Sequence, residues 1–107
     1  MAIFVALRSP ELEVVGLTTI FGNVYTALAT RNALHLLETA GRTDIPVTEG
    51  SHVTQGTLNP LHHVCINKAT KLRIASLVHG SDGLGNQNFH PPAGKAVEQS
   101  VAAFFVE

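Results

Sequence analysis

The stretch Glu13–Leu37, EVVGLTTIFGNVYTALATRNALHLL, decides the fold of this sequence. A nearly continuous run of β-prone aliphatic residues predicts a strand at Leu12–Thr18, of the kind that is covered on both faces in a parallel sheet. From Val24–Ala40 the apolar residues recur at helical spacing, which predicts an amphipathic helix. We expect Asn23 to cap this helix at its start and Gly41 to follow its last turn.

Three shorter segments flank this unit. Met1–Leu7 predicts the tail of a helix, because the following Ser-Pro dipeptide disfavours its continuation. Val101–Val106 predicts the start of another helix, with Ser100 as its cap. Asp44–Val47 is the expected next parallel strand, and strand, helix and strand together form a right-handed βαβ unit. The sequence therefore predicts the α/β class with a parallel, Rossmann-like sheet.

The Thr18–Asn23 turn is the first candidate for a functional site. In open α/β sheets, ligands bind at the carboxyl ends of the strands, which is where this turn lies. The Asn23 amide offers a hydrogen-bond donor and an acceptor to such a ligand. From these residues alone, a turn or capping asparagine with no site role is the commoner explanation.

The composition is that of one core-rich globular domain at most. The chain has 107 residues, of which 45% are hydrophobic and 14% are charged. With a net charge of -1 the chain has no excess of basic residues, so we expect no nucleic-acid partner. No apolar run approaches the roughly 20 residues that span a bilayer, so we expect no membrane association. The lone Cys65 excludes an internal disulfide, and without a signal-peptide pattern the expected location is cytoplasmic.

The segment His79–His90 has the composition of a loop and holds the second candidate residue. Its glycines and asparagines tolerate positive φ angles. His79 could face a ligand, although a loop histidine that bonds its own backbone is an equal alternative. Asp82 is expected to form an Asx-turn or face solvent, and we do not assign it as a metal ligand. The residues open to positive φ are Gly80, Gly83, Gly85, Asn86 and Asn88.

The segment at about residues 55–67 is atypical. It has no hydrophobic period, and a long structureless segment inside a compact domain indicates a special or inserted piece. It contains the pair His62-His63, whose side chains point to opposite faces of an extended chain, so metal binding by this pair has little support. We predict a single partial domain over residues 1–107 with an atypical segment at 55–67 and no metal ligands.

Three segments in the right order resemble one protein family. They are VVGLTTIFGNV at residues 14–24, NALHLLETAGRTDIPVTEGSH at Asn32–His52, and HGSDGLGNQNF at His79–Phe89. Together they are similar to the inosine-uridine-preferring nucleoside hydrolases, the nucleoside N-ribohydrolases, of plant type. The first segment looks like the second strand and turn of that family, and the third looks like the loop over its active site. The resemblance implies that this chain is part of a nucleoside hydrolase domain.

The resemblance also implies an activity and two residue roles. Family members cleave the N-glycosidic bond of purine and pyrimidine ribonucleosides, such as inosine and uridine, to base plus ribose. Asn23 matches an asparagine beside the ribose and a calcium-bound water. His79 matches a loop histidine near the substrate, where an imidazole can donate to the leaving group or stack on the base. We therefore expect both residues to be catalytic and to bind the ribonucleoside.

The calcium ligands of the family are missing from this sequence. In the family they come from a motif of the pattern DTDPGxDDA, and this sequence begins where that motif would have ended. Its own aspartates, Asp44 and Asp82, are far apart. We therefore expect a truncated fragment that binds no calcium and has no activity of its own. The alternative is a non-catalytic isoform that pairs with full-length subunits through exposed apolar faces, as in a homo-oligomer.

Overall fold

The structure is a computed structural model that describes residues 1–51, 76–87 and 89–106. The atypical segment at 55–67, with its histidine pair, lies outside the described residues. Cys65 and Asn88 also lie outside them, so the expectations for these residues stay untested.

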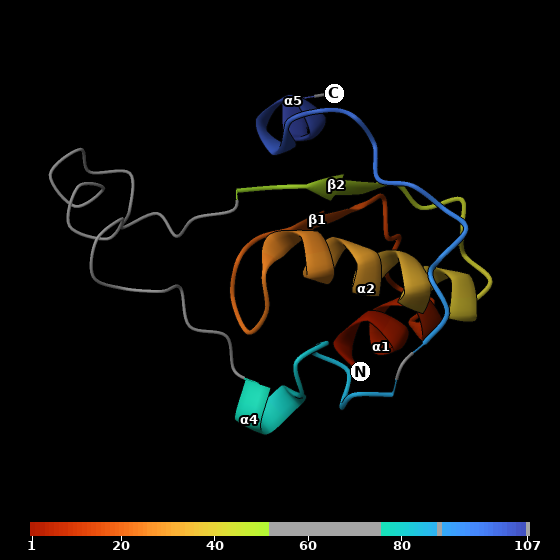
Figure 1. Ribbon diagram of the computed structural model, residues 1–107. Coiled ribbons are helices and arrows are strands. Elements are labelled where there is room, and N and C mark those ends of the chain that lie inside the picture. Colours follow the sequence, from red (N-terminus) through yellow and green to blue (C-terminus); the bar gives the residue numbers. More distant parts are fainter. Residues whose placement is uncertain (52–75, 88, 107) are drawn as a thin grey trace, which may run out of the picture.

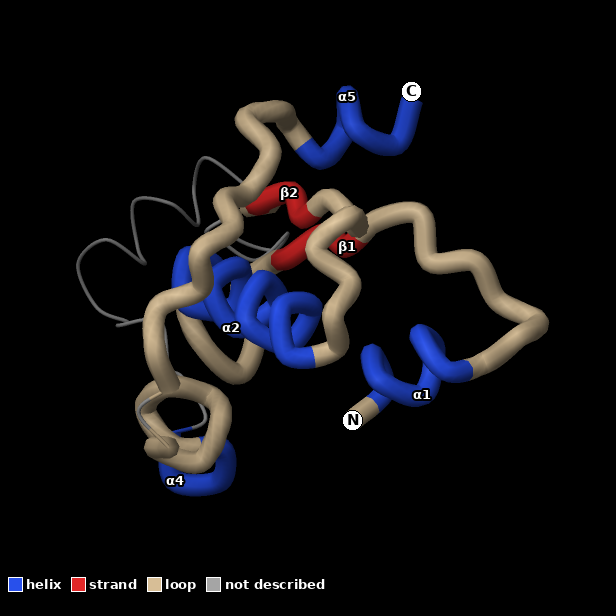
Figure 2. The backbone as a smooth tube through the Cα atoms, turned by 90° about the vertical axis from the view of Figure 1, so that its right-hand side faces the viewer, coloured by secondary structure: helices blue, strands red, loops and turns tan. Residues whose placement is uncertain are grey.

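The described elements stack in three layers (Figure 1). Strands β1 (Leu17–Thr19) and β2 (Val47–Glu49) form a parallel pair in which Leu17 lies opposite Val47. Helix α2 (Thr26–Thr39) covers one face of this pair, and α5 (Val101–Val106) lies on the other face. Figure 2 shows the same order of layers from the side. The predicted α/β class and the parallel pairing are therefore confirmed.

The core lies between α2 and the two strands. Leu37 of α2 and Val47 of β2 are each 1% exposed, and Ala33 and Ile45 are buried beside them. Leu17 packs against this cluster from β1. Because a helix buries only one stripe, these few contacts orient α2 along the strand pair.

Both strands form further along the chain than the sequence indicates. The strand expected at Leu12–Thr18 is observed at Leu17–Thr19, and Val15 is 76% exposed instead of covered on both faces. The β-ladder starts where the two segments first pair. Pro46 has no amide hydrogen to donate, but its carbonyl accepts a hydrogen bond from the Leu17 amide at 2.9 Å. β2 therefore follows Pro46 instead of containing it.

The start of α2 also differs from the prediction, whereas its end agrees. The N-cap residue is Tyr25 and no side chain caps the helix, so the expected capping role of Asn23 is wrong. At the other end, Gly41 adopts a φ of +70° and donates to the Glu38 carbonyl at 3.1 Å. The Arg42 amide donates to the Leu37 carbonyl at 2.8 Å, which completes a Schellman motif.

Three short helices surround this unit. α1 (Ala2–Arg8) ends before Pro10 as expected, and α4 (Ser76–His79) leads into the glycine-rich loop. At the start of α5, the Ala103 amide donates to the Ser100 hydroxyl at 3.2 Å, which confirms the predicted cap. No helix in the described ranges has the length and hydrophobicity needed to cross a membrane.

The core predicts a large contrast between two leucines. Replacing Leu37 with Ala removes a side chain that is 1% exposed, and we expect it to lower the free energy of unfolding by about 2–5 kcal/mol. The control is Leu77→Ala in α4, because Leu77 is 102% exposed and its loss should change stability by at most about 0.5 kcal/mol. Urea denaturation followed by circular dichroism measures both, and equal midpoints for the two variants would contradict the packing described here.

Candidate functional site

A cavity of about 490 Å³ lies at the carboxyl end of β1. Four segments form it: Ile3 of α1, the β1 strand with its turn, the side of α2, and the loop that begins at His79. Asn23 and His79 both line this cavity, so the fold brings together the two candidate residues from distant parts of the sequence. A concave, mainly apolar space with a few polar groups is the usual form of a small-molecule site.

The turn presents Asn23 to the cavity with its amide available. Asn23 is exposed, and its side chain makes no hydrogen bond to the described part of the chain. The turn itself is held by its backbone: the Gly22 amide donates to the Val24 carbonyl, and the Phe21 amide donates to the Ser51 carbonyl. A fixed backbone with a free amide suits recognition of a polar ligand.

A chain of buried hydroxyl groups fixes α2 against the strand ends. The Thr19 and Thr30 hydroxyls lie 2.7 Å apart, and Thr30 donates to the Thr26 carbonyl at 2.9 Å. Thr26 donates to the Ser51 carbonyl at 2.7 Å, just beyond β2. Because buried hydroxyl groups need partners, these bonds hold the start of α2 and the turn before it in one arrangement.

The loop after α4 has the backbone that its composition predicts. Gly80, Gly83 and Gly85 have φ angles of +79°, +75° and +73°, and Asn86 has a φ of +58°. A Cβ atom at Gly83 would lie 2.8 Å from Cγ1 of Val24, so only glycine allows the loop to pack this closely against the turn. The loop thereby closes one side of the cavity.

The Asp82 carboxylate organises this loop. Its Oδ1 accepts from the Leu84 amide at 2.9 Å and from the Asn86 amide at 2.8 Å. These two hydrogen bonds hold the pKa of Asp82 below its usual value, because they stabilise the ionised form. The expected Asx-turn is confirmed, and the carboxylate is already engaged within its own loop.

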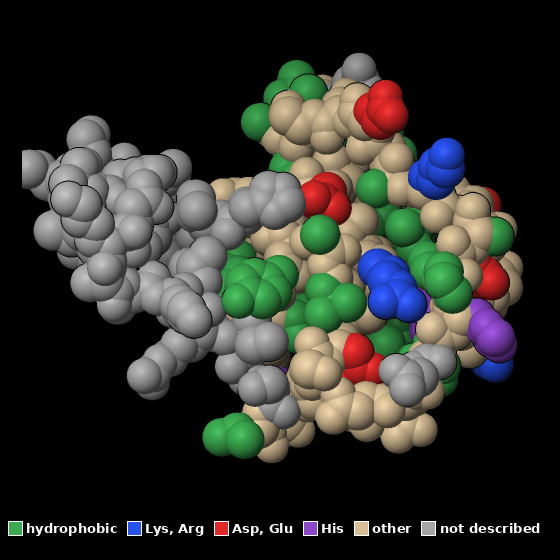
Figure 3. Space-filling model, viewed as in Figure 1, with side chains coloured by type: hydrophobic (Ala, Val, Ile, Leu, Met, Phe, Trp, Pro, Cys, Tyr) green, Lys and Arg blue, Asp and Glu red, His purple; other side chains and the backbone are tan. Residues whose placement is uncertain are grey.

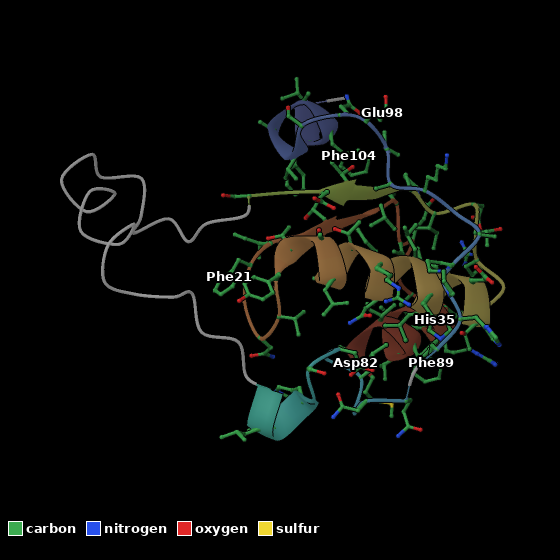
Figure 4. All side chains as sticks on the ribbon, in the orientation of Figure 1. Phe21, His35, Asp82, Phe89, Glu98 and Phe104 are labelled. Atoms are coloured by element: carbon green, nitrogen blue, oxygen red, sulfur yellow. The ribbon has the colours of Figure 1, made fainter. Side chains whose placement is uncertain are left out.

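A second, smaller cavity of about 120 Å³ lies on the outer side of the same loop. Here the His35 ring lies 4.5 Å from the Phe89 ring, although no partner for His35 was visible in the sequence. Figure 4 shows His35, Phe89 and Asp82 close together beside α2. The Arg31 guanidinium donates to the Phe89 carbonyl at 3.3 Å, so α2 also holds the chain beyond the loop.

The described residues do not fit a calcium site. Among them, no group of three or more His, Cys, Asp or Glu side chains lies close enough to hold a metal ion. Both aspartates are engaged: Asp82 bonds its own loop, and Asp44 forms an ion pair with Arg42 at 3.0 Å that lowers the pKa of Asp44. Of the eight acidic residues in the sequence, Glu107 alone lies outside the described ranges.

The sequence analysis missed Asn32, which also lines the cavity. Ala29, Ala33 and Leu36 line it as well, and their spacing places them on the same face of α2 as Asn32. A polar residue within this stripe of small and apolar residues was the available signal. The spacing of apolar residues that predicts the helix assigns no role to a polar residue such as Asn32.

Comparison with known proteins identifies the family. The model of the inosine-uridine preferring nucleoside hydrolase family matches residues 1–107. This chain belongs to that family. A probable uridine nucleosidase 2 of Arabidopsis thaliana is 68% identical over 107 residues, which are 100% of this chain and 30% of that protein. Uridine nucleosidase 1 of the same plant is 49% identical over 100% of this chain and 28% of its own length.

Solved nucleoside hydrolase structures have the same fold. A plant nucleoside hydrolase, the PpNRh1 enzyme, superposes with a TM-score of 0.79 at 47% identity, over 98% of this chain and 30% of that one. A purine-preferring ribonucleoside hydrolase from Gardnerella vaginalis also reaches 0.79, at 26% identity. The chain thus spans about 30% of the length of these nucleoside hydrolases.

The Asp82 hydrogen bonds predict a pH-dependent loop. Because the pKa of Asp82 is lowered in the folded chain, its stabilising effect is present above the ordinary Asp pKa of about 3.9 and is lost as the pH falls through the lower, folded value. We expect the Leu84 and Asn86 amides to lose protection from hydrogen exchange over that interval. Exchange measured by NMR from pH 6 to pH 3 tests this.

Two variants serve as controls for this pH dependence. Asp82→Asn should remove it, because the amide does not ionise in this range. Asp44→Asn should leave it unchanged, because Asp44 bonds Arg42 instead of the loop. Equal pH dependence in Asp82→Asn and the unchanged chain would contradict the role of the carboxylate.

Proposed function

We propose that the 490 Å³ cavity binds a ribonucleoside and belongs to a site that hydrolyses its N-glycosidic bond. The supporting observation is that Asn23 and His79, from separate segments, line this one cavity. The family description and the relatives agree with this choice, since they include uridine nucleosidases and a pyrimidine-specific ribonucleoside hydrolase of Photobacterium profundum.

The cavity offers a nucleoside the contacts that it needs. Leu17, Leu36 and Leu84 contribute apolar surface suited to the flat face of a nucleobase. The Asn23 amide can donate to one ribose hydroxyl and accept from another. These contacts fix the sugar at the turn and direct the base toward the loop.

His79 suits the departure of the base. Hydrolysis of the bond requires attack by water at the ribose C1 carbon, stabilisation of positive charge on the ribose, and a proton for the leaving base. An imidazole at the cavity wall can donate that proton or stack on the base. We assign His79 to this step and Asn23 to orienting the ribose.

Among the residues that the structure describes, we find no candidate group to activate the attacking water. Both aspartates are engaged elsewhere, and the described residues do not fit a calcium site. We therefore propose that the 107-residue chain binds a ribonucleoside without hydrolysing it. The expected calcium-dependent chemistry of the family would need groups beyond these residues.

A second candidate function is pairing with full-length subunits. Several large apolar side chains are uncovered, including Val15 at 76% and Phe105 at 71% exposed. Figure 3 shows hydrophobic side chains uncovered at α5 and around the start of α2. Surfaces of this kind favour association with another protein, and in this alternative the chain acts as a non-catalytic partner.

Nucleoside binding predicts a role for the turn amide. We expect Asn23→Ala to raise the dissociation constant for uridine about three- to tenfold, because it removes amide hydrogen bonds to the ribose. The control is Gln87→Ala, since Gln87 is an exposed amide outside the cavity lining. Titration with uridine followed by NMR measures both, and an unchanged affinity in Asn23→Ala would remove the proposed ribose contact.

The lack of a water-activating group among the described residues predicts binding without turnover. We expect the purified 107-residue chain to release no uracil from uridine above background, with or without added calcium. Chromatography of the products measures this, with an intact plant uridine nucleosidase as the positive control. Calcium-dependent release of uracil by the chain alone would overturn the proposal. A changed size or activity of the intact enzyme after mixing would favour the pairing function instead.

A further inference from the structure

Among the described residues, most hydrogen bonds of the loop over the cavity are between residues of the loop itself. Within the loop, the Ser81 amide and hydroxyl both donate to Oδ1 of Asn86, and the Gly83 amide donates to the Gly80 carbonyl. The Gly85 amide donates to the His79 carbonyl at 2.8 Å. Together with the Asp82 contacts, these bonds link residues 79–86 to one another.

One side chain of α2 joins this unit to the layered core. Nδ2 of Asn32 donates to the Asp82 carbonyl at 2.6 Å, and the bond is partly buried. The same Nδ2 atom lies 3.2 Å from the place where a Cβ atom of Gly83 would stand. Asn32 therefore contacts the loop by a hydrogen bond and by close packing at adjacent residues.

The position of Asn32 makes this contact relevant to the ligand. It lines the large cavity and also the small cavity behind the loop, so it stands between the two spaces that the loop separates. A shift of the loop toward either space would move Leu84 and His79, which line the large cavity. Because the Gly85 amide bonds the His79 carbonyl within the loop, a contact that holds the loop at Asp82 also bears on the position of His79.

We propose that Asn32 is a positioning residue that holds the 79–86 loop against α2 and thereby places His79 at the nucleoside. This inference rests on the proposed function for the ligand, whereas the anchoring of the loop is independent of it. Asn32 does not take part in bond cleavage. Its role is to keep the cavity wall closed and the imidazole at a fixed place.

The test uses the full 107-residue chain with two substitutions at one position. Asn32→Ala removes both the donor and the packing, and Asn32→Asp keeps the shape but loses the donor. In each variant we expect the Leu84 and Asn86 amides to exchange about three- to tenfold faster, with α2 amides unchanged. We expect the dissociation constant for uridine to rise by a similar factor.

Two further variants separate anchoring from general destabilisation. Asn32→Gln retains an amide donor, and we expect it to recover part of the loop protection. Thr39→Ala removes a side-chain bond of the same helix, from the Thr39 hydroxyl to the His35 carbonyl, and should leave the loop unaffected. Gly83→Ala alters the same contact from the loop. It should also speed hydrogen exchange of the loop amides, because the added Cβ would meet Val24 and Asn32.

The outcomes distinguish this inference from the proposed function. Faster exchange throughout α2 and the loop in Asn32→Ala would overturn the anchoring role, since it would indicate a structural residue only. Normal exchange in Asn32→Asp would also overturn it, because the hydrogen bond would then be dispensable. If the unchanged chain does not bind uridine, the proposed function fails, while the exchange measurements still decide whether Asn32 anchors the loop.

Discussion

The packing of α2 across the parallel strand pair is the constraint on which the rest of this structure depends. Leu37 and Val47 make the centre of that contact, and both are almost fully buried. The hydroxyl bonds from Thr26 and Thr30 then set the start of the helix against the strand ends. The Phe21 amide holds the turn before α2, and the Thr26 hydroxyl holds the start of the helix, both by hydrogen bonds to the Ser51 carbonyl. This wall of the cavity therefore has a fixed position.

A different set of interactions forms the second wall of the cavity. After His79, the last residue of α4, the loop has no strand or helix, and positive φ angles together with the Asp82 carboxylate give it its shape. Such a loop can be rigid internally and still move as a unit. The hydrogen bond from Asn32 to the Asp82 carbonyl connects it to α2.

The face of the sheet opposite α2 is only partly covered by the described residues. Phe104 of α5 packs against Gly16, where a larger residue would collide with the ring. The neighbouring Phe105 and Val106 are exposed, and so is Val15 before β1. The relatives reported above are about three times as long as this chain, which covers 30% of their length.

The order of helices and strands follows from local sequence. Periodicity located α2, and residue preferences at helix ends located the glycine after it and the cap of α5, because these depend on nearby residues. Composition likewise predicted the left-handed residues of the loop and the Asx-turn at Asp82. The strand limits were wrong because a ladder begins where its partner begins, and the partner of Leu17 is decided by the packing of distant segments.

The family resemblance in the sequence singled out Asn23 and His79, but only the tertiary structure brought them to one cavity. The free Asn23 amide, the buried threonine hydroxyls and the Asn32 anchor were not visible in the sequence, since each depends on contacts between residues far apart in the chain. Local chemistry thus determined which segments form turns, helices or strands. Long-range packing decided which polar groups face one another and which are left for a ligand.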